Sequence, residues 1–263
     1  MVTLDQAGWG RAALILLPPP LALVDLVDFL WIDQRPRARS AGDRWRVVPD
    51  DAPHIIYCRF TDERRLAEQH RLHVVGARER YVDIDRARRV LTVGARLRPG
   101  ALPVLFDVSA RELTDRSEPA DSLVRNPSRA ALSRLEDAAP SDAAQHITAF
   151  IDSLARGRTL DARARWLAGT DGAAVPVVRD AAKRLGVGER ALRAWSTAQF
   201  GLGLRRFMTI RRLHRALEGR LRHPTTTWSR IAAWAGFADQ PHLVRDCRAL
   251  LGETPREFLA RAS

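Results

Sequence analysis

The sequence predicts an α+β protein of two domains, a β-rich, barrel- or sandwich-like N-terminal domain and an all-α C-terminal domain in which a long helix joins two helix pairs. Short strand-like runs dominate the first half, helical spacing dominates the last third, and the last third is strongly basic. A length of 263 residues suits two domains, and 46% apolar content is enough for two cores. We expect domain limits of 1–135, 136–169 for connecting helices, and 170–263.

The N-terminal region contains short runs rich in Val, Ile and aromatic residues, separated by Gly, Pro, Asp or Arg clusters. Such runs are typical of strands, and many short strands favour a barrel or a sandwich. The run 21–33 is either a short helix or a strand packed on the core. The expected strands are RAALILL (11–17), WRVVP (45–49), HIIYCRF (54–60), RLHVVGA (71–77), RYVDI (80–84), VLTVGARL (90–97) and PVLFDV (103–108).

Residues 136–169 change character and become rich in alanine. EDAAPSDAAQHITAFIDSLARG places Ile147, Phe150, Ile151 and Leu154 on one helical face, and LDARARWLAG predicts a second helix. These helices could form part of a dimer interface, relay a state between the domains, or simply pack against the β-rich domain.

The stretch 228–258 predicts two short helices around a tight turn. Ile231, Ala232 and Ala235 are spaced for one buried face, and Gly236 can end the first helix in a left-handed conformation. Asp239 is a suitable N-cap for the second helix, and Pro241 fits its first turn. The apolar residues Leu243, Cys247 and Leu250 repeat at i, i+4 and i+7, while the other face carries Gln240, His242, Arg245 and Arg248.

A second copy of this pattern lies upstream at 178–200. Ala182 and Gly186 are four residues apart, as are Ala232 and Gly236, and Arg190 and Arg193 are expected to point outward. Between the copies, apolar residues at helical spacing predict one long amphipathic helix that holds the two pairs in a fixed relation. These apolar residues are Leu204, Phe207, Ile210, Leu213, Leu217 and Leu221.

A short helix, a turn with glycine and a second helix with a polar outer face form the helix-turn-helix pattern. Over about the last 90 residues the chain resembles the DNA-binding domain of the AraC/XylS family of transcription regulators. The phrases that carry the resemblance are GFADQPHLVRDCRALLGETPREF and, more loosely, LGVGERALRAWSTAQFGLGLRRFMTIRRLHRAL. Ala194 departs from the pattern, because many members have a basic residue there. Elements such as PPPLALVDLVDFLW and GARLRPGALPVLFDVSARELTD also look like one N-terminal type found in such regulators.

The resemblance implies a bacterial-type, cytoplasmic transcription factor that binds double-stranded DNA. It also implies an N-terminal domain that senses a small-molecule effector or forms a homodimer, with RNA polymerase as a further partner. The charge supports a polyanion partner: residues 171–263 hold 17 basic and 8 acidic residues, whereas 1–170 hold 26 and 23.

The second helix of each pair would enter a major groove and offer side chains to base edges. We expect base reading by Arg190 and Arg193 in the first pair, and by Gln240, His242 and Arg245 in the second. Candidates for phosphate contact, which positions a protein without specifying sequence, are Arg205, Arg206, Arg211, Arg212 and Arg230. The alternative for each is an ordinary solvated arginine.

Other classes of function find less support in the sequence. The alternative we weigh is an enzyme with a cupin-like β-domain and a basic tail that localises it on DNA. His70 and His73 are three apart, whereas strand ligands on one face would be two apart, and His54 beside Asp50 and Asp51 is no better. No nucleophile, phosphate-loop or dinucleotide motif is present. We therefore expect no enzyme activity, no catalytic residue, no cofactor and no metal.

The two cysteines and the apolar runs bear on the compartment. Cys58 and Cys247 are expected in cores, which suits a reducing cytosol rather than a disulfide framework. No basic segment precedes the first apolar run as in a signal peptide, and the run 13–32 is interrupted by three prolines and two aspartates. We expect no membrane association.

Overall fold

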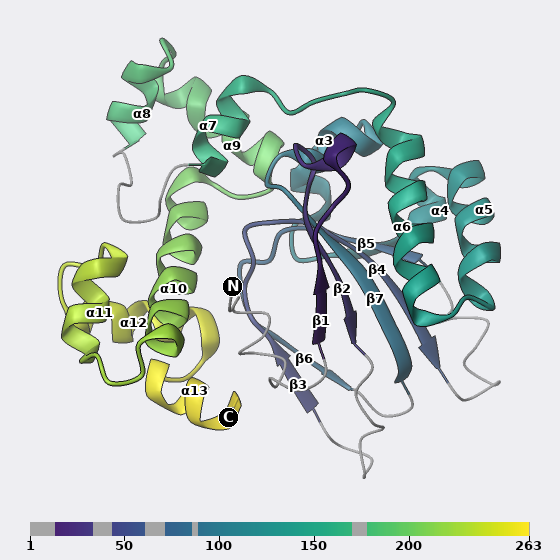
Figure 1. Cartoon of the computed structure of the whole chain (residues 1–263). Helices are drawn as coiled ribbons and strands as arrows, with labels where there is room; N and C mark the ends of the chain where they lie inside the picture. Colours follow the sequence, from purple (N-terminus) through teal and green to yellow (C-terminus); the bar gives the residue numbers. More distant parts are fainter. Residues whose placement is uncertain (1–13, 34–43, 61–71, 86–88, 170–177, 263) are drawn as a thin grey trace.

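The computed structural model describes residues 14–33, 44–60, 72–85, 89–169 and 178–262 (Figure 1). A β-rich N-terminal part is followed by a C-terminal part that is helical throughout its described residues. The elements in chain order are β1 (Leu14–Leu17), η1 (Leu21–Leu23), β2 (Val27–Asp33), β3 (Arg44–Val47), β4 (His54–Phe60), β5 (Leu72–Val75), β6 (Val82–Asp85), β7 (Arg89–Leu97), α3 (Ala101–Phe106), η2 (Ala110–Leu113), β8 (Ser117–Pro119), α4 (Ala120–Leu123), α5 (Arg125–Glu136), α6 (Pro140–Ala155), α7 (Ala162–Gly169), α8 (Val178–Arg184), α9 (Glu189–Phe200), α10 (Leu204–Arg222), α11 (Trp228–Ala235), α12 (Gln240–Leu251) and α13 (Pro255–Ala262).

The strands form two antiparallel sheets. The larger sheet has the order β1-β2-β7-β4-β5-β8, and β3 pairs with β6 in a separate two-stranded sheet. Six of the runs expected as strands overlap an observed strand, and 21–33 combines both alternatives, a single 3₁₀ turn followed by β2. The α+β class with a β-rich N-terminal part and a helical C-terminal part is confirmed.

One expected strand, PVLFDV at 103–108, is wrong. Residues Ala101–Phe106 form helix α3, which starts after Gly100 at φ 92° and ends at Asp107 at φ 54°. Its buried residues are Ala101, Leu102, Leu105 and Phe106, a spacing that gives one helical face. The short apolar run suited both periods, and the helix that forms packs against α6 and α9, which are distant in sequence.

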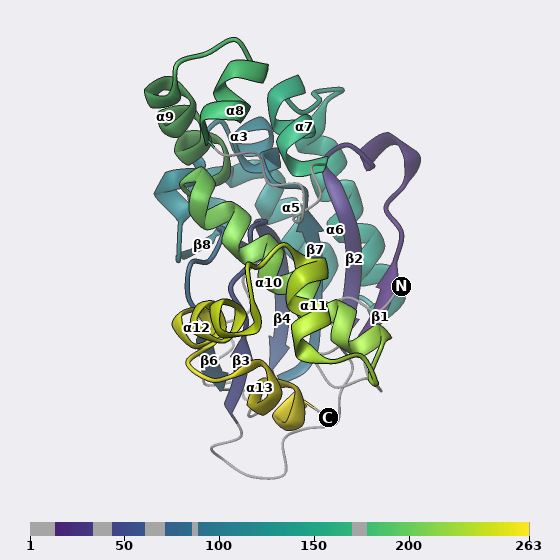
Figure 2. The ribbon, with the colours of Figure 1, turned by 90° about the vertical axis from the view of Figure 1, so that its left-hand side faces the viewer.

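Helices α5 and α6 lie along one side of the larger sheet, and α10 lies on the other side (Figures 1 and 2). The predicted apolar face of α6, Ile147, Phe150, Ile151 and Leu154, is buried in the core that this helix shares with the sheet strands. Of the alternatives considered for this helix, packing against the strands is the one that the contacts of α6 show.

A second core holds the C-terminal helices together. Leu204, Phe207, Ile210, Leu213 and Leu217 of α10 are all buried, as the amphipathic pattern predicts. The rings of Phe200 at the end of α9 and Phe207 stack at 4.6 Å, a contact that fixes α9 on α10. Ala164 and Leu167 of α7 also belong to this core, so α7 packs with the C-terminal helices.

Among the described residues, no helix combines the length and apolar character that crossing a membrane would require.

Both cysteines are buried, as the sequence predicts, and they are not joined in a disulfide. Burial, together with the acidic residues Glu253, Glu257 and Asp246, raises the pKa of the Cys247 thiol to about 12.

We expect Cys247 to remain a thiol and to resist a disulfide reagent at pH 8 in the native protein, because the thiolate is the reacting form. Both cysteines should react once the chain is unfolded in urea. Rapid native labelling of Cys247, located by mass spectrometry, would contradict this packing.

Candidate nucleic-acid interface

Helices α11 and α12 form the helix pair expected at 228–258. Gly236 ends α11 at φ 87°, and the Asp239 carboxylate caps α12 by accepting from the backbone N–H of His242 at 2.6 Å. Leu243, Cys247 and Leu250 are fully buried. The cap satisfies an otherwise unpaired backbone N–H and fixes the residue at which α12 begins. It thereby also fixes which residues of α12 lie on its polar face.

The outer face of α12 is polar and exposed. Gln240, Arg245 and Arg248 are exposed, and all three line an open hollow between this helix and the start of α11. Ser229 of α11 donates to the Gln240 side-chain oxygen at 2.9 Å. Arg248 lies three residues after Arg245 on the same face, a spacing that could have added it to the candidates for base contact.

His242 differs from the other candidates on α12. Its ring meets the Phe237 ring edge to face, with centroids 5.3 Å apart, and its Nε2 lies 3.4 Å from the Asp246 carboxylate. Only 30% of its side chain is exposed. These contacts direct the imidazole toward the turn and its own helix rather than outward.

The upstream pair consists of α8 and α9. Gly186 turns the chain at φ 65°, and Leu192 is buried beneath α9. Arg190 and Arg193 are exposed, as expected, and Arg193 donates to Glu189 at 2.8 Å along the same helix. Because this ion pair is exposed, it contributes little free energy, and a DNA phosphate or base can replace Glu189 as the partner of Arg193.

The arginines expected to contact phosphates have three kinds of surroundings. Arg205 and Arg230 are exposed, whereas Arg212 lies with its guanidinium 5.3 Å from the centroid of the Phe237 ring. Arg206 donates to the Glu79 carbonyl at 2.9 Å, and Arg211 pairs with the Asp51 carboxylate at 2.9 Å. The last two side chains therefore contact the β-rich part of the chain.

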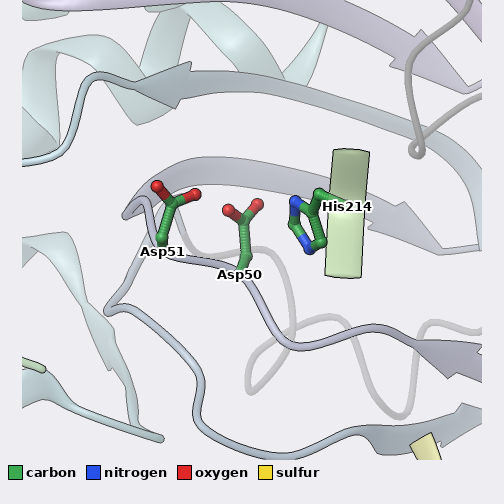
Figure 3. Close-up of side chains that lie close together, drawn as sticks. All are labelled: Asp50, Asp51 and His214. Carbon is green, nitrogen blue, oxygen red and sulfur yellow. The ribbon is translucent and has the colours of Figure 1, made fainter. Parts of the chain in front are cut away.

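Asp50 and Asp51 precede β4, and His214 reaches toward them from α10 (Figure 3). One ligand atom from each lies within 4.8 Å of the others, a spacing that could suit a metal ion. However, Arg96 donates to both carboxylates, at 2.7 and 2.8 Å, and Arg211 donates to Asp51. Two guanidinium groups already neutralise these oxygens and would repel a cation, so we assign this cluster no metal role.

The other histidines considered for a metal site are placed as follows. His54 Nε2 lies 2.8 Å from Asp50, and His73 Nδ1 lies 3.2 Å from the Ser117 hydroxyl. His70 lies outside the described residues. His214 Nε2 donates to the Pro49 carbonyl at 2.6 Å, a contact between positions too far apart in sequence for spacing to reveal.

The buried ion cluster shifts the pKa of Asp50. Burial alone would raise the pKa, but the charge of Arg96 and the contact with His54 outweigh burial and hold the pKa well below its usual range. The same cluster raises the pKa of Arg96 despite the burial of its guanidinium. Asp50 is therefore ionised whenever the protein is folded near neutral pH.

Two family models match this chain. Residues 181–261 match a model described as a helix-turn-helix domain, and residues 16–119 match a domain of unknown function, DUF6597. No curated protein gives a match to the chain.

Several solved structures are similar to the chain. A DNA-binding transcriptional dual regulator from Escherichia coli K-12 is 21% identical over 35% of this chain and 81% of that chain, with a TM-score of 0.31. ToxT from Vibrio cholerae is 11% identical over 88% of this chain and 96% of its own, with a TM-score of 0.46. ToxT with an unsaturated fatty acid bound is 12% identical over 84% and 97%, with a TM-score of 0.43.

The paired helices and the match at 181–261 define a DNA-binding protein of the helix-turn-helix class. The domain at 181–261 is of the AraC type, as its motifs indicate, and it follows a separate β-rich N-terminal region.

We expect Arg96→Met to lower the free energy of unfolding at pH 7 by about 3–5 kcal/mol, because it leaves Asp50 and Asp51 buried beside less positive charge. A carboxyl whose pKa is depressed by folding contributes stability above its unfolded pKa, about 3.9, and loses it as pH falls through the folded value. The parent should therefore lose stability below about pH 4, and the variant should lose less over that range.

Urea unfolding between pH 3 and pH 7 measures both effects. Asp107→Asn is the matched control, since Asp107 is 81% exposed in its pair with Arg158 and should matter by less than about 1 kcal/mol. Equal stability of Arg96→Met and the control at pH 7 would refute a stabilising role for the cluster.

Proposed function

We propose that the protein is a sequence-specific regulator that reads two adjacent major-groove segments, one with α9 and one with α12. The observation that carries the proposal is shared by both helices. Each buries an apolar stripe in the second core and exposes arginines on the opposite face. With 19 residues, α10 spans about 28 Å, which suits two segments roughly one turn of duplex apart.

We assign base reading to Arg190 and Arg193 of α9 and to Gln240 and Arg245 of α12. Arginine can donate two hydrogen bonds to guanine O6 and N7, and glutamine can pair with adenine, each worth about 1–3 kcal/mol of discrimination. The contacts of His242 with Phe237 and Asp246 suit a role in fixing the turn, and we assign it that role instead.

For phosphate contact we retain the exposed Arg205 and Arg230, with Arg212 as a further candidate. We assign Arg206 and Arg211 to the contact with the N-terminal part, because their guanidinium groups already bind acceptors there. Phosphate contacts position the protein and make binding depend on salt, but they carry no sequence information.

We further propose a modulatory N-terminal domain that ends after α6, with α7 as the first helix of the DNA-binding domain. The two cores support this division, since α6 packs in the first and α7 in the second. A small-molecule effector or a second copy of the chain would act through the N-terminal domain. In the cytoplasm, the protein would bind double-stranded DNA and contact RNA polymerase.

Selection of bound duplexes from a random DNA pool tests the proposal. Two conserved blocks about one helical turn apart, on the same face of the duplex, are the expected result. A pool with no enrichment, or equal affinity of the protein for selected and random duplexes, would reject sequence-specific reading.

Arg245→Ala should relax the preference at one base pair of one block and weaken binding to the selected site by roughly 10- to 100-fold, the loss of one two-bond contact. Electrophoretic titration against the selected site and its single-base variants, in constant salt, measures this. Arg129→Ala, which removes an exposed arginine from α5, is the control and should bind as the parent does. Parent-like specificity of Arg245→Ala would exclude α12 as the reading helix.

Salt dependence separates the two groups of arginines on α10. Arg205→Gln should reduce the slope of log K against log salt by about 0.9, the value for one phosphate contact. Arg211→Gln should leave that slope unchanged, because its side chain pairs with Asp51. A reduced slope for Arg211→Gln would mean that Arg211 leaves Asp51 and contacts phosphate when DNA binds.

A further inference from the structure

The N-terminal part of the chain contacts α9 at the end of that helix. The Thr114 hydroxyl donates to the Gly201 carbonyl at 2.6 Å, and the Gln199 side chain donates to the Gly100 carbonyl at 3.0 Å. A Cβ atom at Gly201 would lie 2.9 Å from the Ala110 carbonyl, so the backbones meet directly. The exposed arginines of α9 lie in its first half, away from these contacts.

The same arrangement holds for α12. The Tyr81 backbone N–H donates to the Leu250 carbonyl at 3.3 Å, and Arg46 donates to the Leu251 carbonyl at 3.0 Å. Asp83 holds the Arg46 guanidinium through two bonds of 2.8 and 2.9 Å. Figure 2 shows α12 beside β3 and β6, the small sheet that bears these side chains.

Between these two contacts, the N-terminal part also binds α10. Asp51 is only 2% exposed and accepts from Arg96 of the N-terminal part and from Arg211 of α10. His214, one turn further along α10, donates to the Pro49 carbonyl. A carboxylate this buried is stable only with its charge compensated, so separating the two parts would remove one of the two guanidinium groups that compensate it.

We propose that the N-terminal domain positions the two recognition helices relative to each other, and that Asp51 and Arg211 are the positioning pair. Recognition helices contact bases with their N-terminal residues, and the N-terminal domain holds their opposite ends and the helix between them. The docked arrangement therefore leaves both reading surfaces accessible and fixes the spacing at which they engage DNA together. This inference rests on the proposed function, because it concerns how the two reading helices cooperate.

The test compares Asp51→Asn with Glu218→Gln in the full-length protein. Both changes remove one negative charge, and Glu218 pairs with Arg222 one turn further along α10. Affinity is measured for three duplexes: the selected site, the site with one block scrambled, and the site with two base pairs inserted between the blocks.

We expect Asp51→Asn to bind the selected site about tenfold more weakly than Glu218→Gln, and the scrambled duplex within about twofold of it. The inserted base pairs should weaken Asp51→Asn less than the parent, because its helices are less strictly spaced. A selected-site affinity equal to or above that of Glu218→Gln would overturn the proposal, and a higher affinity would show that docking inhibits binding.

Amide hydrogen exchange without DNA gives an independent readout of docking. Asp51→Asn should speed exchange at the Tyr81 amide, which bonds to α12, and leave the amides of α6 protected. If α6 also loses protection, the N-terminal fold has been damaged, and Arg211→Gln, which keeps the Asp51–Arg96 pair, decides the matter by the same measurements. Failure to select any site would reject the proposed function alone, whereas unchanged exchange in both variants would reject the positioning pair alone.

Discussion

The structure depends on two buried aspartates at the junction between a β-rich part and a helical part. Asp50 and Asp51 cannot be buried without compensating charge, and Arg96 supplies it from β7. Arg211 supplies more from α10, so the charge balance of the junction includes a residue of the DNA-binding domain. Ion pairs of this kind add little net stability over apolar contacts, but they penalise any arrangement that leaves one partner alone.

The two helix-turn-helix units are built on one pattern but offer DNA different surfaces. In the second unit, a side-chain cap at Asp239 begins α12, and Gln240, Arg245 and Arg248 line one exposed hollow. The first unit begins α9 after Gly188 without a side-chain cap, and Arg193 is engaged by Glu189. The second unit thus gathers three donors around one hollow, which under the proposed function favours a larger share of base discrimination for α12.

The sequence predicted best where local spacing and packing agree. The i, i+4, i+7 stripe of Leu243, Cys247 and Leu250 and the cap at Asp239 are local features, and the structure confirms them. The apolar run 103–108 satisfied both strand and helix spacing, and the helix that forms there packs against α6 and α9, which are distant in sequence. The polarity of Arg211 likewise predicted that its side chain lies outside the helical core. It did not predict that the guanidinium would pair with Asp51, 160 residues away in the sequence.

That limit explains why arginine-rich helices of this kind are hard to interpret from sequence. An arginine on the polar side of α10 can contact one of three things: solvent, a phosphate, or a carboxylate of another domain. Amphipathic spacing is the same for all three. Only the tertiary arrangement separates Arg205, which is exposed, from Arg211, whose guanidinium meets a carboxylate that is 2% exposed. The electrostatic surface available to DNA is therefore smaller than the count of basic residues suggests, and the N-terminal domain determines which of them remain available.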